Sequence, residues 1–270
     1  MTTLIHPTAV IHPRAELHPT VQVGAYAVIG ERVKVGAGTV IGHHAVLDGL
    51  TEIGARNQIF PGAAIGLEPQ DRKYDGSLSL VTIGDDNTIR EYVTINRATH
   101  HGEATVIGNS NLLMSYVHIA HNCVIEDQTT IASSTVMGGH VWVESKATIG
   151  GASAIHQFVH IGRLSMIGGM NRIVHDVPPY LLVEGNPARV RTLNQVGLKR
   201  AGLVDDSHTF QILKKAFRLL YRSGIPFTDA LDQLDLLPDN EYLNHLRQFL
   251  RLSLSPGRRG LIPGKRRGEG

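Results

Sequence analysis

The chain of 270 residues is short of cysteine and of aromatic residues, and each shortage narrows what it can be. Cys123 is the single cysteine, so no internal disulfide can form, and we expect a cytoplasmic protein. Aromatic residues make up 5% of the chain, which argues against a wide core and suits a narrow one. The hydrophobic fraction of 42% still predicts a folded globular protein.

Long apolar segments are missing as well. No stretch approaches the ~20 consecutive apolar residues of a membrane-spanning helix, so we do not expect an integral membrane protein. The first residues, Met1 to Leu4, lack the basic and apolar regions of a signal peptide, which again predicts a cytoplasmic location.

The charge is nearly balanced but unevenly distributed. Residues 1–190 carry 12 basic and 16 acidic side chains, a net −4, whereas residues 191–270 carry 14 and 8, a net +6. Positive charge gathered at one end predicts an acidic partner or a phosphate-containing ligand there. We expect no nucleic-acid partner.

What the sequence has in place of long apolar runs is a period of six. From Ile5 to Ile173 every sixth residue is aliphatic or methionine, and only Asp71, Ser77 and His101 interrupt the series. A helix repeats near 3.6 residues and a strand near 2, so neither explains this period. Glycine often follows the aliphatic residue, and we expect it there to relieve the backbone at a corner.

Hexapeptide repeats of this kind are typical of an all-β, left-handed parallel β-helix. Three hexads form one coil of a three-sided prism, with the aliphatic side chains inside and residues three hexads apart in adjacent coils. The left hand rests on similarity to known hexapeptide proteins. Those proteins cover their exposed branched side chains by forming trimers, so we expect a homotrimer.

The repeats also predict the domain organisation. Residues 1–190 form the β-helix, with loop excursions near 67–82 and 97–105, where the pattern fails. Residues 191–254 have helical periodicity and predict a C-terminal helical domain. Residues 255–270 are rich in Gly, Arg and Lys and predict a flexible tail.

Within the C-terminal domain we expect a short helix beginning at Leu198 and two later helices at about 228–237 and 241–253. A longer helix, between the short one and these two, carries Phe210, Leu213, Phe217 and Leu220 on one face.

The phase of the repeat singles out one histidine. His121 lies two residues after the inward Ile119, so its side chain is predicted to be outside the core. Gly139, three hexads later, is predicted to lie beside it in the next coil. A neutral imidazole suits a general base, and a backbone N–H suits an oxyanion. Together they are the minimum machinery for acyl transfer.

A second column is made of small residues. Ser133, Gly151 and Gly169 follow one another at intervals of three hexads and are predicted to stack on one corner. Such a column would leave a groove for an extended apolar chain.

Several segments together resemble one known family. They are QDRKY at 70–74, HIAH at 118–121, GGH at 138–140, IHQF at 155–158, GLKR at 197–200 and YRSG at 221–224. With these motifs in order along nearly the whole chain, the sequence resembles the UDP-N-acetylglucosamine O-acyltransferase family, which catalyses the first step of lipid A synthesis. The hexads alone would indicate only the wider superfamily.

The resemblance implies an enzyme that transfers a 3-hydroxyacyl chain from acyl carrier protein to the glucosamine 3-hydroxyl of UDP-N-acetylglucosamine. The carrier thioester is a co-substrate, and neither a cofactor nor a metal is implied. His121 would be the general base, and the Gly139 N–H would bind the oxyanion. The implied substrate-binding residues are Gln70, Asp71, Lys73, His118, His140, His156, Gln157, Asn194 and Arg200. The implied carrier-docking residues are Lys199, Lys214, Lys215, Arg218 and Arg222.

The sequence departs from the family pattern at several positions. Asn122 replaces the usual Asp after the catalytic histidine, so it can orient the ring but adds no charge, and we expect slower turnover. Asn96 replaces a frequent His, and Gln195 replaces a Glu. At the family's chain-length stop this chain has Gly169, which predicts a long acyl chain. Met166 and Met170 are the nearby candidates to obstruct it.

Other functions are open on the same prism. One is the N-acyltransferase that acts later in lipid A synthesis, although that family carries an additional uridine-binding domain and lacks a long helical end. Another is a γ-type carbonic anhydrase, with His118, His121 and His140 as zinc ligands. A third is a nucleotide-sugar binder without catalytic activity.

Overall fold

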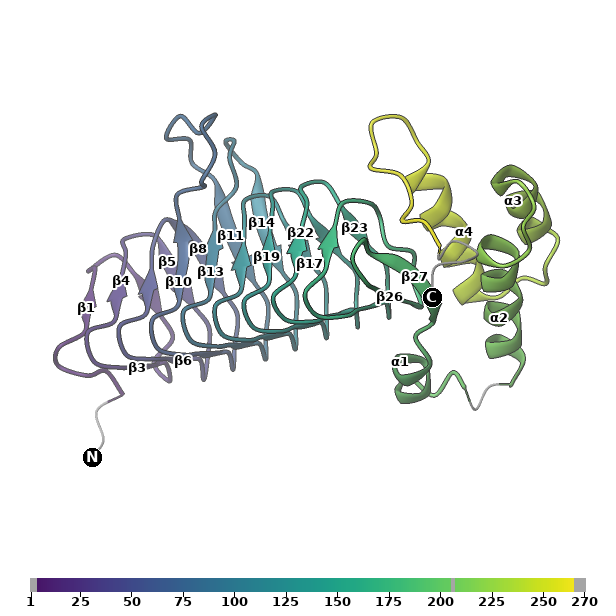
Figure 1. The fold of residues 1–270 in the computed structure, drawn as a ribbon. Helices are drawn as coiled ribbons and strands as arrows, with labels where there is room; N and C mark the ends of the chain where they lie inside the picture. The colour runs from purple at the N-terminus through teal and green to yellow at the C-terminus, as the bar shows by residue number, and fades with distance from the viewer. Residues whose placement is uncertain (1–3, 205–206, 265–270) are drawn as a thin grey trace.

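The computed structural model describes residues 4–204 and 207–264. Within these residues the strands form a left-handed parallel β-helix of three sheets, and four helices follow at its C-terminal end (Figure 1). The predicted fold class is confirmed.

Each sheet forms one wall of the prism. The first wall contains β1 (Val10–Ile11), β4 (Val28–Ile29), β7 (Val46–Leu47), β10 (Ala64–Leu67), β13 (Thr94–Asn96), β16 (His118–Ile119), β19 (Val136–Met137), β22 (Ala154–Ile155) and β25 (Arg172–Ile173). The second contains β2 (Glu16–Leu17), β5 (Val33–Val35), β8 (Leu50–Ile53), β11 (Leu80–Ile83), β14 (Ala104–Ile107), β17 (Val124–Ile125), β20 (Trp142–Val143) and β23 (His160–Ile161).

The third wall ends in an antiparallel pair that leads to the helices. It contains β3 (Gln22–Val23), β6 (Val40–Ile41), β9 (Gln58–Ile59), β12 (Thr88–Ile89), β15 (Leu112–Leu113), β18 (Thr130–Ile131), β21 (Thr148–Ile149), β24 (Met166–Ile167), β26 (Leu181–Glu184) and β27 (Arg189–Leu193).

The register explains why the period of six survives two loop excursions. Ile29 pairs with Leu47, three hexads further along the chain. Ile53 pairs with Ile83, five hexads on, and Ile83 pairs with Ile107, four hexads on. The two inserted lengths are therefore whole numbers of hexads, so the aliphatic phase is kept on either side. The longer insertion spans two hexad positions and the shorter one spans a single position, which accounts for the three interruptions in the series.

The inward aliphatic residues form the core, and Ile65, Ile95 and Ile119 have no exposed surface. The prediction that glycine after the aliphatic residue relieves the backbone at a corner is wrong. The corner residues with positive φ lie three positions after the aliphatic residue, and they include Asn122 at 60°. Gly24 is instead required by close approach, because a Cβ there would lie 2.8 Å from the backbone N of the next coil.

The helices are α1 (Gln195–Arg200), α2 (Ser207–Tyr221), α3 (Phe227–Asp235) and α4 (Glu241–Ser253). The first begins before the predicted start at Leu198, because the Asn194 side chain accepts a hydrogen bond of 3.0 Å from the Gly197 N–H and caps it. Leu213, Leu243 and Leu250 are buried between the longer helices and the end of the prism.

The flexible tail predicted from residue 255 is wrong for residues 255–264. Ile262 is only 2% exposed, and its N–H donates to the Asp176 carbonyl at 2.9 Å. The buried Asp176 carboxylate also accepts hydrogen bonds from Ser253 and Arg258, at 2.7 and 3.1 Å. The segment therefore returns to the last coil of the prism. Residues 265–270 lie outside the described part of the chain.

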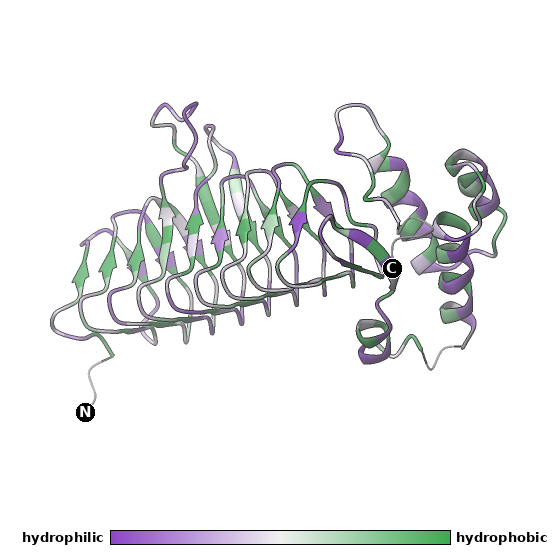
Figure 2. Cartoon of the chain, viewed as in Figure 1, coloured by the Kyte–Doolittle hydropathy of each residue, from purple (hydrophilic) through white to green (hydrophobic). Residues whose placement is uncertain are grey.

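Hydropathy follows this architecture. The prism strands are largely hydrophobic in Figure 2, whereas the helices show both hydrophobic and hydrophilic faces. None of the helices in residues 4–204 and 207–264 combines the length and the apolar character that crossing a bilayer requires.

Candidate active site

Two loops rise from one edge of the prism and frame the site (Figure 1). The first connects β10 to β11 and the second connects β13 to β14. Arg97 in the second loop links the two, since its guanidinium donates to the Tyr74 hydroxyl at 2.7 Å and to the Gly66 carbonyl at 2.9 Å. The buried side chain of Asn96 donates to the Glu68 carbonyl at 2.5 Å. The loops are thus fixed against each other by polar contacts.

His121 lies directly below these loops, at the corner after β16. Its Nδ1 is 2.9 Å from Asn122 Oδ1 and 2.9 Å from Thr99 Oγ1. The Asn122 oxygen can only accept, so Nδ1 keeps its hydrogen and Nε2 retains a lone pair. Nε2 faces Asp71 Oδ2 at 3.8 Å. The ring is 13% exposed, which leaves Nε2 free to act as a base within reach of a substrate.

Asp71 belongs to the first loop, and its side chain lies close to His121. The Lys73 backbone N–H, and to a smaller degree the nearby His121, hold the pKa of the Asp71 carboxyl below its usual range. Thr99 Oγ1 lies 3.5 Å from Asp71 Oδ2. Asp71 is therefore an ionised acceptor that faces the proposed base.

Gly139 lies beside His121 as predicted. The His140 N–H donates to the His121 carbonyl at 3.0 Å, which places the two segments in adjacent coils. A Cβ built on Gly139 would collide with Cε1 and Nε2 of the His121 ring. The imidazole therefore packs against bare backbone.

The Gly139 N–H has no hydrogen-bond partner among the described residues, although the residue is buried. At some of the equivalent positions, two residues after the inward aliphatic, a side chain accepts a hydrogen bond from the backbone N–H. Asp127 accepts from the Asn109 N–H at 2.6 Å, and Glu126 accepts from the Ser145 N–H at 2.9 Å. Because buried N–H groups are normally paired, the open one beside His121 is available for a ligand oxygen.

Two more histidines border His121. His140 meets it edge-on at 5.3 Å between ring centroids and stacks on Phe158 at 4.8 Å. His118 Nδ1 is 2.7 Å from Thr94 Oγ1. Burial, and then the neighbouring His121, lowers the pKa of both His118 and His140. Both rings are thus kept neutral at physiological pH.

The other predicted substrate-binding residues fall into two groups. Gln157 stands in the column of His121 and Gly139, two coils from the histidine, and its carbonyl is 3.1 Å from His156 Nδ1. Gln70 and Lys73 are exposed on the first loop.

Asn194 and Arg200 do not join this cluster. Asn194 is 9% exposed and uses its side chain within the fold, capping α1 and donating to the Leu164 carbonyl at 2.8 Å. Arg200 is exposed on α1, beyond the last coil of the prism (Figure 1).

Thr99 and Glu103 are functional candidates that sequence reasoning missed. Thr99 contacts His121, and Glu103 contacts Asn122 at 2.7 Å. Both belong to the second loop, where the vertical spacing is four hexads rather than three. The failure of the hexad at His101 was the one available signal, and it located the loop without identifying these partners.

The small-residue column stacks as predicted. The Met170 N–H donates to the Gly151 carbonyl at 2.8 Å, and a Cβ on Gly169 would first meet that carbonyl, at 3.2 Å. Met170 is 83% exposed and Met166 is half-buried. The column thus presents backbone rather than side chains to the outside.

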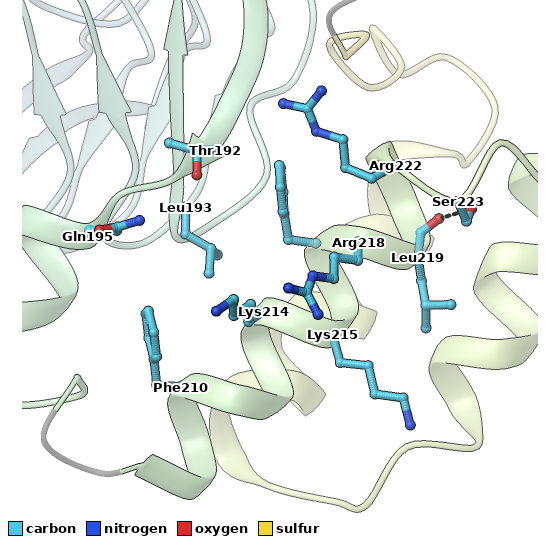
Figure 3. A pocket seen from close by; sticks show the side chains of 11 residues that line it. Thr192, Leu193, Gln195, Phe210, Lys214, Lys215, Arg218, Leu219, Arg222 and Ser223 are labelled. Atoms are coloured by element: carbon cyan, nitrogen blue, oxygen red, sulfur yellow. Dashed lines mark hydrogen bonds between the residues drawn. The ribbon is translucent and has the colours of Figure 1, made fainter.

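A basic hollow of about 670 Å³ lies between α2 and the segment 192–195. Four of the predicted docking residues line it together with Phe210, and Figure 3 shows Lys214, Lys215 and Arg218 on α2 and Arg222 directly after its end. Gln195 lies on the opposite side of the hollow, and Lys199 is exposed on α1.

In the part of the chain that the structure describes, no three His, Cys, Asp or Glu side chains converge on a position suited to a metal ion. Within the described residues of this chain, His118, His121 and His140 do not form a three-histidine metal site.

The prism, with an imidazole beside an open backbone donor, defines a transferase of the hexapeptide-repeat class. A profile described as "Bacterial transferase hexapeptide (six repeats)" matches residues 14–49 and 104–139. One described as "Udp N-acetylglucosamine O-acyltransferase; Domain 2" matches residues 176–262. The chain belongs to the UDP-N-acetylglucosamine O-acyltransferase family.

Similarity to individual members covers nearly the whole chain. The acyl-(acyl-carrier-protein)–UDP-N-acetylglucosamine O-acyltransferase of Gloeothece citriformis is 61% identical over 266 residues, which cover 98% of this chain and 96% of that protein. The Synechocystis protein of the same name is 58% identical over 263 residues, covering 97% and 95%. The crystal structure of the Moraxella catarrhalis UDP-N-acetylglucosamine O-acyltransferase is 39% identical, with a TM-score of 0.90 and coverage of 96% and 100%.

Proposed function

We propose that the chain transfers a 3-hydroxyacyl group from acyl carrier protein to the glucosamine 3-hydroxyl of UDP-N-acetylglucosamine. The observation that carries the proposal is that the free Nε2 of His121 lies beside the backbone of Gly139. The N–H of Gly139 has no hydrogen-bond partner among the described residues. Family membership supports the substrates, since the relatives' names specify an acyl-carrier-protein donor and this nucleotide sugar.

The reaction would proceed by addition and elimination. His121 Nε2 removes the proton from the sugar 3-hydroxyl as its oxygen attacks the thioester carbonyl carbon. The carbonyl oxygen becomes negatively charged and accepts the Gly139 N–H. The carbon–sulfur bond then breaks, and the pantetheine thiolate takes the proton from the His121 imidazolium. The products are the 3-O-acyl sugar and the free thiol of the carrier protein.

Asp71 would hold the sugar in this arrangement. Its carboxylate oxygen lies 3.8 Å from His121 Nε2. A substrate hydroxyl could form a hydrogen bond to either group at this place. Gln70 and Lys73 on the same loop would contact the nucleotide sugar and pantetheine. His118, His140, His156 and Gln157 would line the sugar-nucleotide pocket.

The acyl chain and its carrier protein would bind to two surfaces outside the His121 cluster. The column of Ser133, Gly151 and Gly169 would form the wall of an acyl groove, with Met166 and Met170 at its border. The basic hollow on α2 would receive the acidic carrier protein, with Lys199 nearby. Arg200 would meet the diphosphate of the sugar nucleotide, since guanidinium groups match phosphate geometry.

We propose that the active form is a homotrimer. The first wall of the prism exposes apolar side chains at outward positions, with Val10 63%, Val28 42% and Val136 46% exposed. His118 belongs to the same outward face, so an adjacent subunit would close the site. Light scattering coupled to size-exclusion chromatography tests this proposal, and a stable monomer would contradict it. Both co-substrates are cytoplasmic molecules, and we propose that location for the enzyme.

An acyl-transfer assay tests the activity. UDP-N-acetylglucosamine is offered with carrier-protein thioesters of several chain lengths, with and without a 3-hydroxyl, and the product is identified by mass spectrometry. We expect an ester with 3-hydroxyacyl donors. Absence of product with every donor would favour a binding protein, and acylation only of an amino-sugar acceptor would favour the N-acyltransferase.

A further inference from the structure

Glu103 reaches the site through a single polar contact. Its Oε2 accepts a hydrogen bond of 2.7 Å from Asn122 Nδ2, while Asn122 Oδ1 lies 2.9 Å from His121 Nδ1. The amide of Asn122 thus stands between a carboxylate and the imidazole. Glu103 does not contact His121 in this arrangement.

We propose that Glu103 is a positioning residue for the acyl transfer proposed above, acting by fixing the orientation of the Asn122 amide. An amide presents an acceptor oxygen or a donor nitrogen, depending on how it is turned. A carboxylate on the far side accepts only from the nitrogen, so it forces the oxygen toward His121. The oxygen in turn requires the hydrogen to be on Nδ1, which keeps Nε2 unprotonated as a base.

A second contact agrees with this orientation. The Thr99 backbone N–H donates to Asn122 Oδ1 at 3.1 Å, and a flipped amide would place two donors against each other there. The Asn122 backbone is held by its own hydrogen bond to Thr105 Oγ1, at 2.8 Å. Asn122 also occupies a corner with φ of 60°, a conformation that Asn and Asp tolerate better than most residues. The orientation of the Asn122 amide is therefore set from both sides, by the Thr99 N–H at its oxygen and by the Glu103 carboxylate at its nitrogen.

Hydrogen bonds to its carboxylate keep Glu103 ionised. The hydrogen bond from Asn122 is the largest cause that lowers the pKa of the Glu103 carboxyl, with contributions from His100 and His140. His100 also donates its backbone N–H at 3.3 Å. The ionised carboxylate lies one amide away from the imidazole, so it also favours positive charge on His121 during proton transfer.

Because this inference rests on the proposed function, the test measures wild type, His121→Ala and the Glu103 variants in one assay. We expect Glu103→Ala to lower kcat roughly 10- to 100-fold with KM changed less than about twofold, because substrate contacts remain. Glu103→Gln keeps an acceptor without the charge and should fall between wild type and Glu103→Ala. Glu68→Ala, which removes another acidic contact of the loops, is the matched control and should retain the wild-type kcat.

A rescue experiment separates positioning from loop structure. Adding Asn122→Asp to Glu103→Ala places a carboxylate directly against His121 Nδ1 and should restore kcat to within about threefold of wild type. The same Asn122→Asp change with Glu103 intact should lower kcat, because two carboxylates would then face each other at the contact now made by Asn122 Nδ2.

The outcomes distinguish the two proposals. If wild type transfers the acyl group and His121→Ala does not, an unchanged kcat in Glu103→Ala overturns the positioning role alone. A kcat loss that Asn122→Asp fails to restore, in a variant with the wild-type melting temperature, also overturns it. If Glu103→Ala does not fold, the kcat of Glu103→Gln decides, and a value equal to wild type refutes the proposal. If wild type shows no transfer, the proposed function fails and the inference fails with it.

Discussion

The imidazole of His121 packs against the bare Cα of Gly139, one coil away, so closely that a single added methyl group would collide with the ring. The glycine therefore has two effects at once. It leaves space for the base, and it presents an N–H beside it that is unpartnered within the described residues. One vertical contact in the prism thus brings together the two groups that acyl transfer needs.

Gly139→Ala is expected to damage catalysis more than stability. The methyl group would displace the His121 ring, which is the free end of a side chain and can move without unfolding the coil. We expect kcat to fall roughly 100-fold, since small displacements of a catalytic group have effects of this size. The melting temperature should change by only a few degrees. Steady-state kinetics and calorimetry on the same sample check both, and an unchanged kcat would contradict the packing argument.

Gly169 is expected to allow long acyl chains to bind. Its corner is open, with only the Gly151 carbonyl near a built Cβ. Wild type should accept long acyl chains, and Gly169→Met should reduce kcat/KM for the longest accepted donor roughly 10- to 100-fold while sparing short ones. Competition between donors of different lengths measures the change. An equal loss for all lengths would show that Gly169 does not border the acyl chain.

The basic hollow on α2 predicts a specific effect on the carrier protein. Lys214→Glu combined with Arg218→Glu should raise KM for the carrier thioester roughly tenfold, because two attractive charges become repulsive. KM for the nucleotide sugar, and activity with a free acyl-pantetheine thioester, should stay near wild type. Lys34→Glu, which lies on an N-terminal coil, is the matched control. Equal effects on both donors would exclude docking at this surface.

Glu144 predicts how stability depends on pH. It is 8% exposed, and its oxygens lie 2.8 Å from His160 Nε2 and 3.0 Å from His245 Nε2 on α4. Burial opposes its ionisation, but hydrogen bonds from both histidines outweigh burial and lower the pKa of Glu144 from 4.5 to about 2. A depressed folded pKa stabilises the protein above the unfolded value, and this stabilisation is lost as pH falls from about 4.5 toward 2.

Glu144→Gln should therefore be less stable than wild type by about 3 kcal/mol at neutral pH. The difference between the two proteins should shrink as the pH is lowered through that window. Urea unfolding at pH 7 and pH 3 measures it, with the exposed Glu52→Gln as the control. A difference that is independent of pH would contradict the assignment.

The repeat made the prism predictable, because one aliphatic residue in six must point inward on every wall. It also placed Gly139 beside His121, since residues at matching positions of successive coils stack when each coil holds three hexads. The helix from 241 to 253 followed from its apolar face. The glycines were misinterpreted because the pattern does not distinguish a positive φ from a close approach between coils, and Gly24 belongs to the second kind.

The partners of His121 from the loops were not predictable in this way. Thr99 and Glu103 lie in an insertion, where the regular stacking at three hexads no longer applies. The packing of segment 255–264 was not predicted because its composition is typical of flexible chains. The segment is nevertheless held in place by the buried Ile262 and by contacts with Asp176. The resemblance implies that Asn194 contacts the substrate, and in the structure its side chain caps α1. The contacts of Thr99, Glu103 and Ile262 are long-range, and local sequence does not encode them.

The central claim is that His121 is the base in acyl transfer, and the most direct measurement is kcat for wild type and His121→Ala with UDP-N-acetylglucosamine and a 3-hydroxyacyl carrier thioester. His18→Ala, an exposed histidine on an N-terminal coil, is the control. We predict a loss of roughly 10²- to 10⁴-fold for His121→Ala, as expected for removal of a general base, and none for the control. A kcat within about threefold of wild type for His121→Ala would contradict the account.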